Sequence, residues 1–488
     1  MAGDNAGFAG AGVKIWAVMP LCRITPYCLF AALIGLVSCS QVPNLPDPQM
    51  ARIERFKQAP STSQAQALSQ ASDQSRATWP WWTILQDPEL NRLQDELLQS
   101  NPSLLVLSAQ ARQAQAALAS AQASLWPSLN LNTSATRSAN QLAAVQGTSY
   151  MLSAPLTWEV DLWGRLDALA QSALANLEAS RDDWAAGRRA AQSTLVQTYI
   201  ALRTAERQRD ALVRAEQAYE RSLALTQARW QAGVAASTDV AQAQTQWQSA
   251  RAQRIEVDIQ RAQMEHAIAA LLGRPPAHFE LPPLTNGKLS TWPVTPPDLP
   301  ANIPANLLDQ RPDLQAAKRR FEAANAQIGV AEAAFFPTVN FNLSAGYRSR
   351  EIGNWVSASN QFWTVGPGLA LNLLDFGQRS ANRAQALALR DLALANYRQL
   401  VLKAYQDVED QLVASLQLQL QEQAQGLAWQ SARRNLELTQ AQYLAGTVSY
   451  LNVVVAQTSA LSAERAWLDV QSRRWLAINM LMAGGLRF

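Results

Sequence analysis

Histidine and charged residues are scarce in this chain of 488 residues, and each shortage excludes a class of function. The two histidines, His266 and His278, are not spaced as a metal-ligand pair, so we expect no metal site and no cofactor. The sequence also lacks a phosphate-binding loop and a nucleophile signature, which argues against an enzyme. The net charge is only +3 and the Lys and Arg residues are scattered, which argues against nucleic acid as a partner.

The three cysteines all lie within the first 39 residues, where the sequence has the pattern of a secretory signal. Arg23 precedes an apolar run over 27–37, which is too short for a transmembrane helix of about 20 residues. The run ends in LVSC at 36–39, which resembles the bacterial lipobox and implies a lipid on Cys39. Ser40, rather than an aspartate, follows the cysteine, and by resemblance to sorted lipoproteins this favours the outer membrane. A cleaved signal with an incidental cysteine is the alternative.

Proline is absent from two long stretches, 156–274 and 368–488. The apolar residues in both stretches recur at steps of three or four, which predicts helix. The first glycines suited to a left-handed helix cap are Gly233 and Gly446. Helices of about 68 residues would each be ~100 Å long, at about 1.5 Å per residue. No globular core has that length, so we expect these helices to pack lengthwise against each other or against other chains.

The chain reads as two related halves. A shift of 210 residues places 123–135 on 333–345, and a shift of 213 places 228–250 on 441–463. The segment between the halves contains nine prolines in 36 positions, too many for a helix. The predicted organisation is a signal peptide (1–38), a lipid-anchored leader with an equatorial segment (39–100), a first repeat (101–274), a proline-rich linker and equatorial segment (275–310), and a second repeat (311–488).

Four segments alternate between apolar and polar residues, which predicts strands. Their length of about ten residues matches tilted membrane strands. Aromatic residues gather near the strand ends and one face is small and polar, which favours a membrane barrel over a soluble sheet packed on helices. The expected strands are 128–136, 152–161, 338–348 and 364–373, joined in pairs by loops at 138–149 and 349–361.

Four strands cannot close a barrel alone, and an open sheet edge in lipid leaves backbone groups without hydrogen bonds. We therefore expect an oligomer with one shared barrel. A dimer would supply eight strands and a trimer would supply twelve, and only the larger barrel leaves an open channel. In this interpretation, the aromatic-proline corners at 126–127 and 336–337 mark where a helix stops and a membrane strand begins.

The order of these elements, together with several short motifs, resembles the TolC-like outer membrane efflux proteins in their lipoprotein branch. The motifs are WW at 81–82, DPEL at 87–90, RPDL at 311–314, FP at 336–337 and LDFG at 374–377. The resemblance covers nearly all of the chain after the signal.

The resemblance implies a mainly α fold with a small membrane β part, in which each chain supplies four β-strands and long coiled-coil α-helices in two repeated halves. It also implies a homotrimer that forms a twelve-stranded barrel over a tunnel of twelve helices. The implied partners are outer membrane lipid, a periplasmic adaptor (membrane fusion) protein and an inner-membrane pump of the resistance-nodulation-division type.

In the family, the periplasmic tips of the helical hairpins meet at a closed entrance. By position, Asp239 becomes a gate acceptor, Tyr443 a gate donor and Asn452 a further gate residue. The family's arginine falls on Val448, and its two aspartates fall on Asn452 and Val455. We therefore expect closure by packing and neutral hydrogen bonds. For Asp239 the alternative is a carboxylate that stabilises the start of a helix. The turns that would dock an adaptor lie at Gly233, Val234, Gly446 and Thr447.

The predicted function is that of the outer-membrane channel of a tripartite efflux pump. It would conduct small molecules passively from the periplasm to the exterior of a Gram-negative cell. Two alternatives are the outer-membrane duct of a type I protein secretion system and a non-conducting coiled-coil lipoprotein of the envelope.

Overall fold

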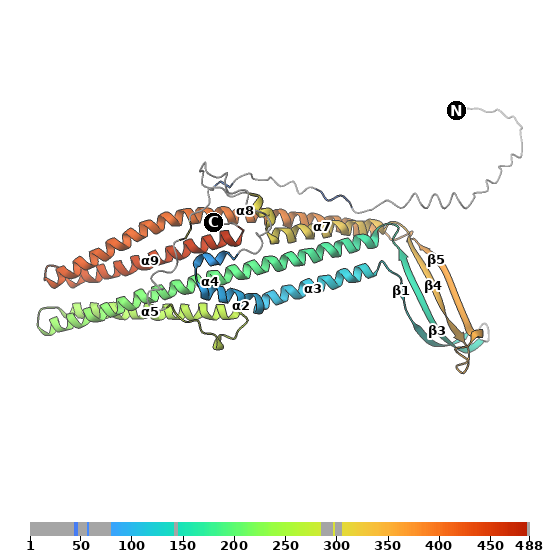
Figure 1. The fold of residues 1–488 in the computed structure, drawn as a ribbon, viewed down its shortest axis with the longest axis horizontal. Coiled ribbons are helices and arrows are strands. Elements are labelled where there is room, and N and C mark those ends of the chain that lie inside the picture. The colour runs from blue at the N-terminus through green and yellow to red at the C-terminus, as the bar shows by residue number, and fades with distance from the viewer. Residues whose placement is uncertain are drawn as a thin grey trace, which may run out of the picture.

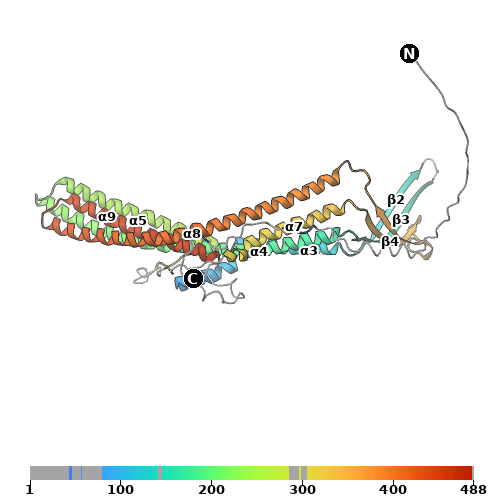
Figure 2. The same ribbon diagram turned by 90° about the horizontal axis from the view of Figure 1, so that it is seen from above.

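The computed structural model describes residues 43–46, 56–57, 80–140, 145–284, 296–297 and 305–485. The predicted signal peptide and Cys39 lie outside these residues. The chain is elongated, with a β-sheet at one end and two helical hairpin tips at the other (Figures 1 and 2).

The elements follow one another in two similar halves. The first half comprises η2 (Trp81–Leu85), α2 (Pro88–Ser100), α3 (Pro102–Ala123), β1 (Ser128–Leu129), β2 (Asn132–Asn140), β3 (Val145–Val160), α4 (Arg165–Gln231) and α5 (Ser237–Leu271). Then come η3 (Pro276–His278), η4 (Ala305–Gln310), α7 (Pro312–Ala333), β4 (Thr338–Ser349), η5 (Ala358–Asn360), β5 (Gln361–Ala370), α8 (Gln378–Leu444) and α9 (Tyr450–Ala483).

The two long helices are confirmed: α4 and α8 have 67 residues each. Each follows a glycine with positive φ, Gly164 at +70° and Gly377 at +91°, a backbone conformation that glycine adopts without steric cost. Both helices run from the sheet to the tips (Figure 1). Towards the sheet α8 lies beside α7, and towards the tips it lies beside α9 (Figure 2). Among the described residues, no helix has both the length and the apolar character to cross a membrane.

The sheet is antiparallel, with β3 and β4 in its centre and the β1–β2 pair and β5 at its two edges. Close packing of β3 on β4 requires glycine at Gly346, where a Cβ atom would lie 2.0 Å from the carbonyl oxygen of Leu152. The two edge strands of the sheet are not paired with each other within the chain.

The strand boundaries differ from the sequence prediction in three places. The first strand is interrupted after Leu129, where the amide of Asn130 still donates to the carbonyl of Pro155. The expected loop 138–149 is wrong, because β2 and β3 pair as far as Asn140 and Val145 and so lengthen the hairpin. The last strand runs over Gln361–Ala370 rather than 364–373, because its ladder with β4 ends where Ala370 pairs with Thr338, the first residue of β4. Alternation alone does not show where ladder hydrogen bonds stop.

The main apolar core lies midway along the molecule, where η2, α2, α4, α5 and α9 meet. Trp475, Ile200 and Leu93 are fully buried there. Phe279 and Leu281 from the proline-rich linker also pack into this core. In its described part, this linker forms only the short 3₁₀ helices η3 and η4, in line with the expected exclusion of a long helix.

Candidate functional site

Two hairpin turns, at 228–240 and 441–453, form the end of the molecule farthest from the sheet (Figure 1). Gly233 and Gly446 have φ of +74° and +77°, which is the left-handed cap that their sequence predicted. In the first turn the amide of Val234 donates to the carbonyl of Arg229, and in the second the amide of Thr447 donates to that of Gln442. These bonds satisfy carbonyls that each helix end would otherwise leave unpaired.

The two tips pack against each other through an apolar cluster, here called the tip cluster. Its buried members are Leu223, Ala243, Tyr443, Tyr450 and Val453, with Val240, Trp247, Val448 and Val454 partly buried against them. The rings of Tyr443 and Tyr450 meet edge to face, with centroids 5.4 Å apart. The cluster therefore joins the first hairpin to the second by packing.

Hydrogen bonds between neutral groups support the tip cluster. The hydroxyls of Tyr450 and Ser222 lie 3.2 Å apart, and the hydroxyl of Tyr219 donates to the carbonyl of Gln457 over 3.2 Å. Burial raises the pKa of both tyrosines, so both stay neutral over the physiological range. Packing and neutral hydrogen bonds therefore join the two hairpins within one chain, whereas closure of the entrance by such contacts stays a prediction.

The structure adds one cation that the sequence prediction missed. Arg229, in the last turn of α4, donates from Nη1 to the carbonyl of Tyr443 and from Nη2 to that of Leu444, both over 3.3 Å. Its Cζ atom lies 4.7 Å from the centroid of the Tyr443 ring. Carry-over by family position could not reveal it, because Arg229 does not occupy one of the charged gate positions.

The predicted gate residues lie at the tips but are not paired with one another. The Tyr443 hydroxyl is buried and has no hydrogen-bond partner among the described residues, so it does not bond to Asp239. Asp239 lies in the first turn of α5, where the helix dipole favours a carboxylate. Its charge also adds to the effect of burial in raising the pKa of Tyr450. Asn452 is exposed on α9.

The outermost turn residues are open to solvent. The side chain of Val234 is 76% exposed, and Thr447 uses its hydroxyl to hold the carbonyl of Gln442 at 3.0 Å. Three family positions carry no charge here: Val448 packs on the tip cluster, Val455 is 57% exposed and Asn452 is also exposed. The roles of these residues in docking and gating remain predictions.

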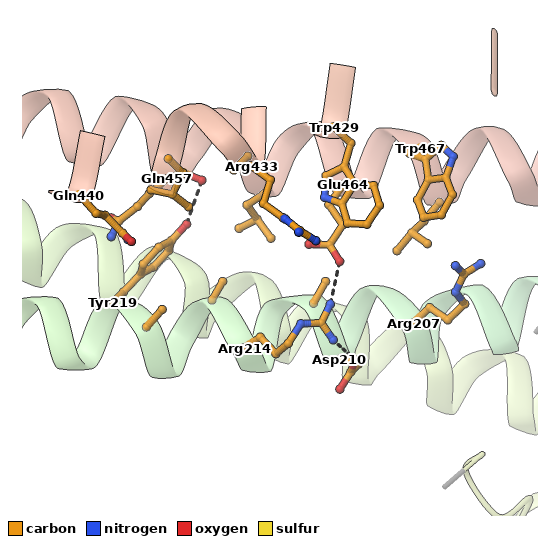
Figure 3. Close-up of a pocket in the computed structure, with 17 residues that line it drawn as sticks. Arg207, Asp210, Arg214, Tyr219, Trp429, Arg433, Gln440, Gln457, Glu464 and Trp467 are labelled. Carbon is orange, nitrogen blue, oxygen red and sulfur yellow. Dashed lines mark hydrogen bonds and ion pairs between the residues drawn. The ribbon is translucent and has the colours of Figure 1, made fainter. Parts of the chain in front are cut away.

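A groove of about 540 Å³ lies between α4, α8 and α9, on the side of the tips that faces the sheet (Figure 3). Trp429 and Trp467 stack there with centroids 4.9 Å apart, and Arg207 covers the Trp467 ring at 5.7 Å. Arg214 and Glu464 form an ion pair of 2.7 Å across the groove. The groove therefore combines an aromatic stack with paired charges. The contacts of Arg207 and Arg214 across it join α4 to α9.

The described residues contain no group of three or more His, Cys, Asp or Glu side chains that could hold a metal ion. A sheet at one end and two long hairpins at the other are instead the architecture of an outer-membrane channel protein. A family model described as outer membrane efflux protein matches residues 93–274 and 303–483. The chain belongs to this family.

Individual relatives agree with this assignment. Outer membrane protein OprJ of Pseudomonas aeruginosa is 30% identical over 461 residues, covering 92% of this chain and 93% of OprJ. The probable outer membrane lipoprotein SilC of Salmonella typhimurium is 26% identical over 473 residues, covering 96% of this chain and 98% of SilC. The open-state crystal structure of the Neisseria gonorrhoeae MtrE outer membrane channel gives a TM-score of 0.76 at 25% identity, covering 92% of this chain and 98% of MtrE.

The predicted family, the mainly helical fold and the location in the outer membrane of a Gram-negative cell are thereby confirmed. The chain is an outer-membrane efflux channel protein. The comparisons do not favour the secretion duct or the non-conducting envelope lipoprotein.

Proposed function

We propose that this protein is the passive exit duct of a tripartite efflux pump and that it works as a homotrimer. Three chains would close one barrel of twelve strands over a tunnel of twelve helices. An adaptor would dock at the turns around Gly233 and Gly446, and an inner-membrane pump of the resistance-nodulation-division type would supply the energy. A lipid on Cys39 would anchor each chain, and the lipoprotein relative SilC supports this assignment.

The observation that carries the proposal is the pair of unpaired sheet edges. Among the described residues of one chain, β1 and β2 pair only with β3, and β5 pairs only with β4. An open edge in lipid would leave several backbone groups unsatisfied, at several kcal/mol each. Pairing β5 of one chain with the β1–β2 edge of the next removes both edges, and further copies continue the wall until it closes.

An exposed apolar stripe on α8 supports the same assembly. The stripe comprises Leu402, Val413, Leu420, Leu427 and Leu438, with exposed fractions from 38% to 66%. Steps of 11 and 7 residues return to almost the same helix face, since a helix has about 3.6 residues per turn. The residues of α8 that line the groove lie on the opposite face, so the stripe points away from α4 of the same chain.

A second copy offers a matching surface on α5. Ala250 and Val257 are buried against the rest of the chain, whereas Ile255 and Ile259 are 47% and 48% exposed on the other face of α5. We propose that this face of α5 packs on the α8 stripe of the neighbouring chain. Leucine and isoleucine exposed in a single chain would then be buried in the trimer.

The assembly is tested with paired substitutions in the stripe. Leu420→Asp with Leu427→Asp places two charges in the proposed interface, and Leu420→Met with Leu427→Met is the matched control. We expect the aspartate variant to be monomeric by light scattering in detergent and the methionine variant to remain trimeric. An aspartate variant that stays trimeric would contradict this interface.

Conduction is tested with the purified, acylated protein in planar bilayers. The proposal predicts stable ion-conducting steps, together with increased drug susceptibility of a strain that lacks the protein. Trimers that never conduct would instead support a bracing role. A deletion strain that remains drug-resistant but fails to export a protein would support the secretion duct.

A further inference from the structure

Arg229 is the only described charged residue that hydrogen-bonds across the tip cluster from one hairpin to the end of a helix in the other. It belongs to α4, and both of its acceptors are the last two residues of α8, Tyr443 and Leu444. Its guanidinium also lies over the ring of Tyr443, at 4.7 Å. One side chain therefore contacts both the backbone and the aromatic ring that seal the second tip.

The acceptors explain why a cation suits this position. The last four carbonyls of a helix have no partner within the helix, and they carry the negative end of its dipole. Ala441, Gln442 and Tyr443 use local backbone amides to satisfy their carbonyls. Among the described residues, Arg229 is the one donor to the carbonyl of Leu444.

Arg229 does not rely on a carboxylate. Within the described part of the chain, no Asp or Glu oxygen lies within ion-pair distance of its guanidinium, although many other arginines in α4 and α5 have such partners. The charge of Arg229 is therefore compensated mainly by the end of α8 and by the face of Tyr443. Separating the hairpins would break both hydrogen bonds of Arg229 and leave the carbonyl of Leu444 without this partner.

We propose that Arg229 is the latch that holds the two hairpins of each subunit together at the closed entrance, and that its release from the end of α8 is part of opening. The inference rests on the proposed channel function. It assigns the intrasubunit latch to a contact between a cation and a helix end, since the expected bond between Tyr443 and Asp239 is not formed.

The test compares Arg229→Met with Arg221→Met in planar bilayers. Methionine keeps a straight, helix-compatible stem and removes the charge and all five donors. Arg221 is exposed two turns earlier on the same helix, so it serves as the matched control. Arg229→Gln is prepared in parallel, so that a folding failure of one variant does not decide the outcome.

We expect Arg229→Met to raise the ratio of open to closed channels by about 5- to 30-fold, the range for a helix-end charge contact worth about 1–2 kcal/mol. Arg229→Gln should have a smaller effect and Arg221→Met none. Because salt screens a charge at a helix end, rising salt should open the unmodified channel and should change Arg229→Met much less. Amides at 441–447 should also exchange faster in Arg229→Met.

Two results separate the possible failures. If the unmodified channel conducts, and Arg229→Met matches Arg221→Met in open fraction, salt dependence and amide exchange, the latch is refuted. If no variant conducts but Arg229→Met speeds exchange at 441–447, the contact exists and the channel function itself is wrong.

Discussion

Replacing Glu206 by Gln tests whether a buried charge network fixes the middle of the molecule. The Glu206 carboxylate accepts from Nη1 of Arg203 over 2.8 Å and from Nε of Arg261 over 3.1 Å. The side chains of Arg203 and Glu206 are only 1% and 4% exposed. Arg203 also donates to the carbonyl of Pro282, so the network ties the proline-rich linker to α4.

Glutamine keeps the shape of Glu206 but leaves two guanidinium groups beside a neutral amide. Arg203 loses its one carboxylate partner among the described residues, whereas Arg261 keeps Glu265. Breaking a buried ion pair on one side costs about 3–5 kcal/mol. We take about 3 kcal/mol, because the amide oxygen of glutamine can still accept one hydrogen bond.

The assay is amide hydrogen exchange over 279–284, where Leu281 and Leu284 donate backbone hydrogen bonds to Glu265 and Glu206. A cost of about 3 kcal/mol corresponds to about 100-fold faster exchange if this segment opens independently. Glu220→Gln, at an exposed position of the same helix, is the control. Equal exchange rates in the two variants would refute the reasoning that the network holds the linker.

Four further predictions follow from single positions. Burial raises the pKa of Tyr199 above the ordinary value of about 10, so its contribution to stability is present below pH ~10 and is lost as pH rises further. The free energy of unfolding should therefore fall less steeply with pH above ~10 in Tyr199→Phe than in the unmodified protein. Gly233→Ala has open space for its Cβ, so it should cost only the left-handed backbone strain of about 1–2 kcal/mol, measured by exchange of the tip amides. Trp467→Ala removes a stacked ring and should lower the free energy of unfolding by about 3 kcal/mol, whereas Trp467→Phe should lower it less. Cys39→Ser should abolish incorporation of labelled palmitate in cells, and undiminished labelling would contradict lipidation there.

Much of the fold could be predicted because its signals are long or repeated. The absence of proline, followed by Gly233 and Gly446, located two helices of 67 residues almost to the residue. Alternation located four strand regions, and the internal repeat supported both results. These signals depend on backbone conformation, which proline, glycine and side-chain period determine locally.

The candidate site was harder to predict because its contacts join residues far apart in the sequence. The contact between Arg229 and Leu444 spans 215 residues and ends on a backbone carbonyl, so no pairing of side-chain types reveals it. Likewise, Tyr450 packs on Tyr443 across a turn and bonds to Ser222 on another helix. Family positions indicated where the tips lie, but this chain holds them together with other residues.

The two halves differ at the tips, which explains why the first hairpin supplies the cation of the latch and the second supplies the carbonyls. The shift of 213 residues that aligns the tips places Arg229 opposite Gln442 and Asp239 opposite Asn452. Both charges of the first tip are thus replaced by neutral amides in the second. Only the first hairpin can offer a cation, and only the helix end of the second, α8, receives one.

This asymmetry makes the exchange of roles testable. Introducing Gln442→Arg into Arg229→Gln moves the cation to the second hairpin, where it would face the carbonyl end of α4. That end is capped in the same pattern as the end of α8: the amides of Gly233 and Val234 bond to the carbonyls of Trp230 and Arg229, and the described residues give the carbonyl of Gln231, the counterpart of Leu444, no partner. We therefore expect the swapped variant to be more closed in planar bilayers than Arg229→Gln. A swapped variant that stays as open as Arg229→Gln would show that a cation near a free helix-end carbonyl does not suffice, and that Arg229 also needs the face of Tyr443.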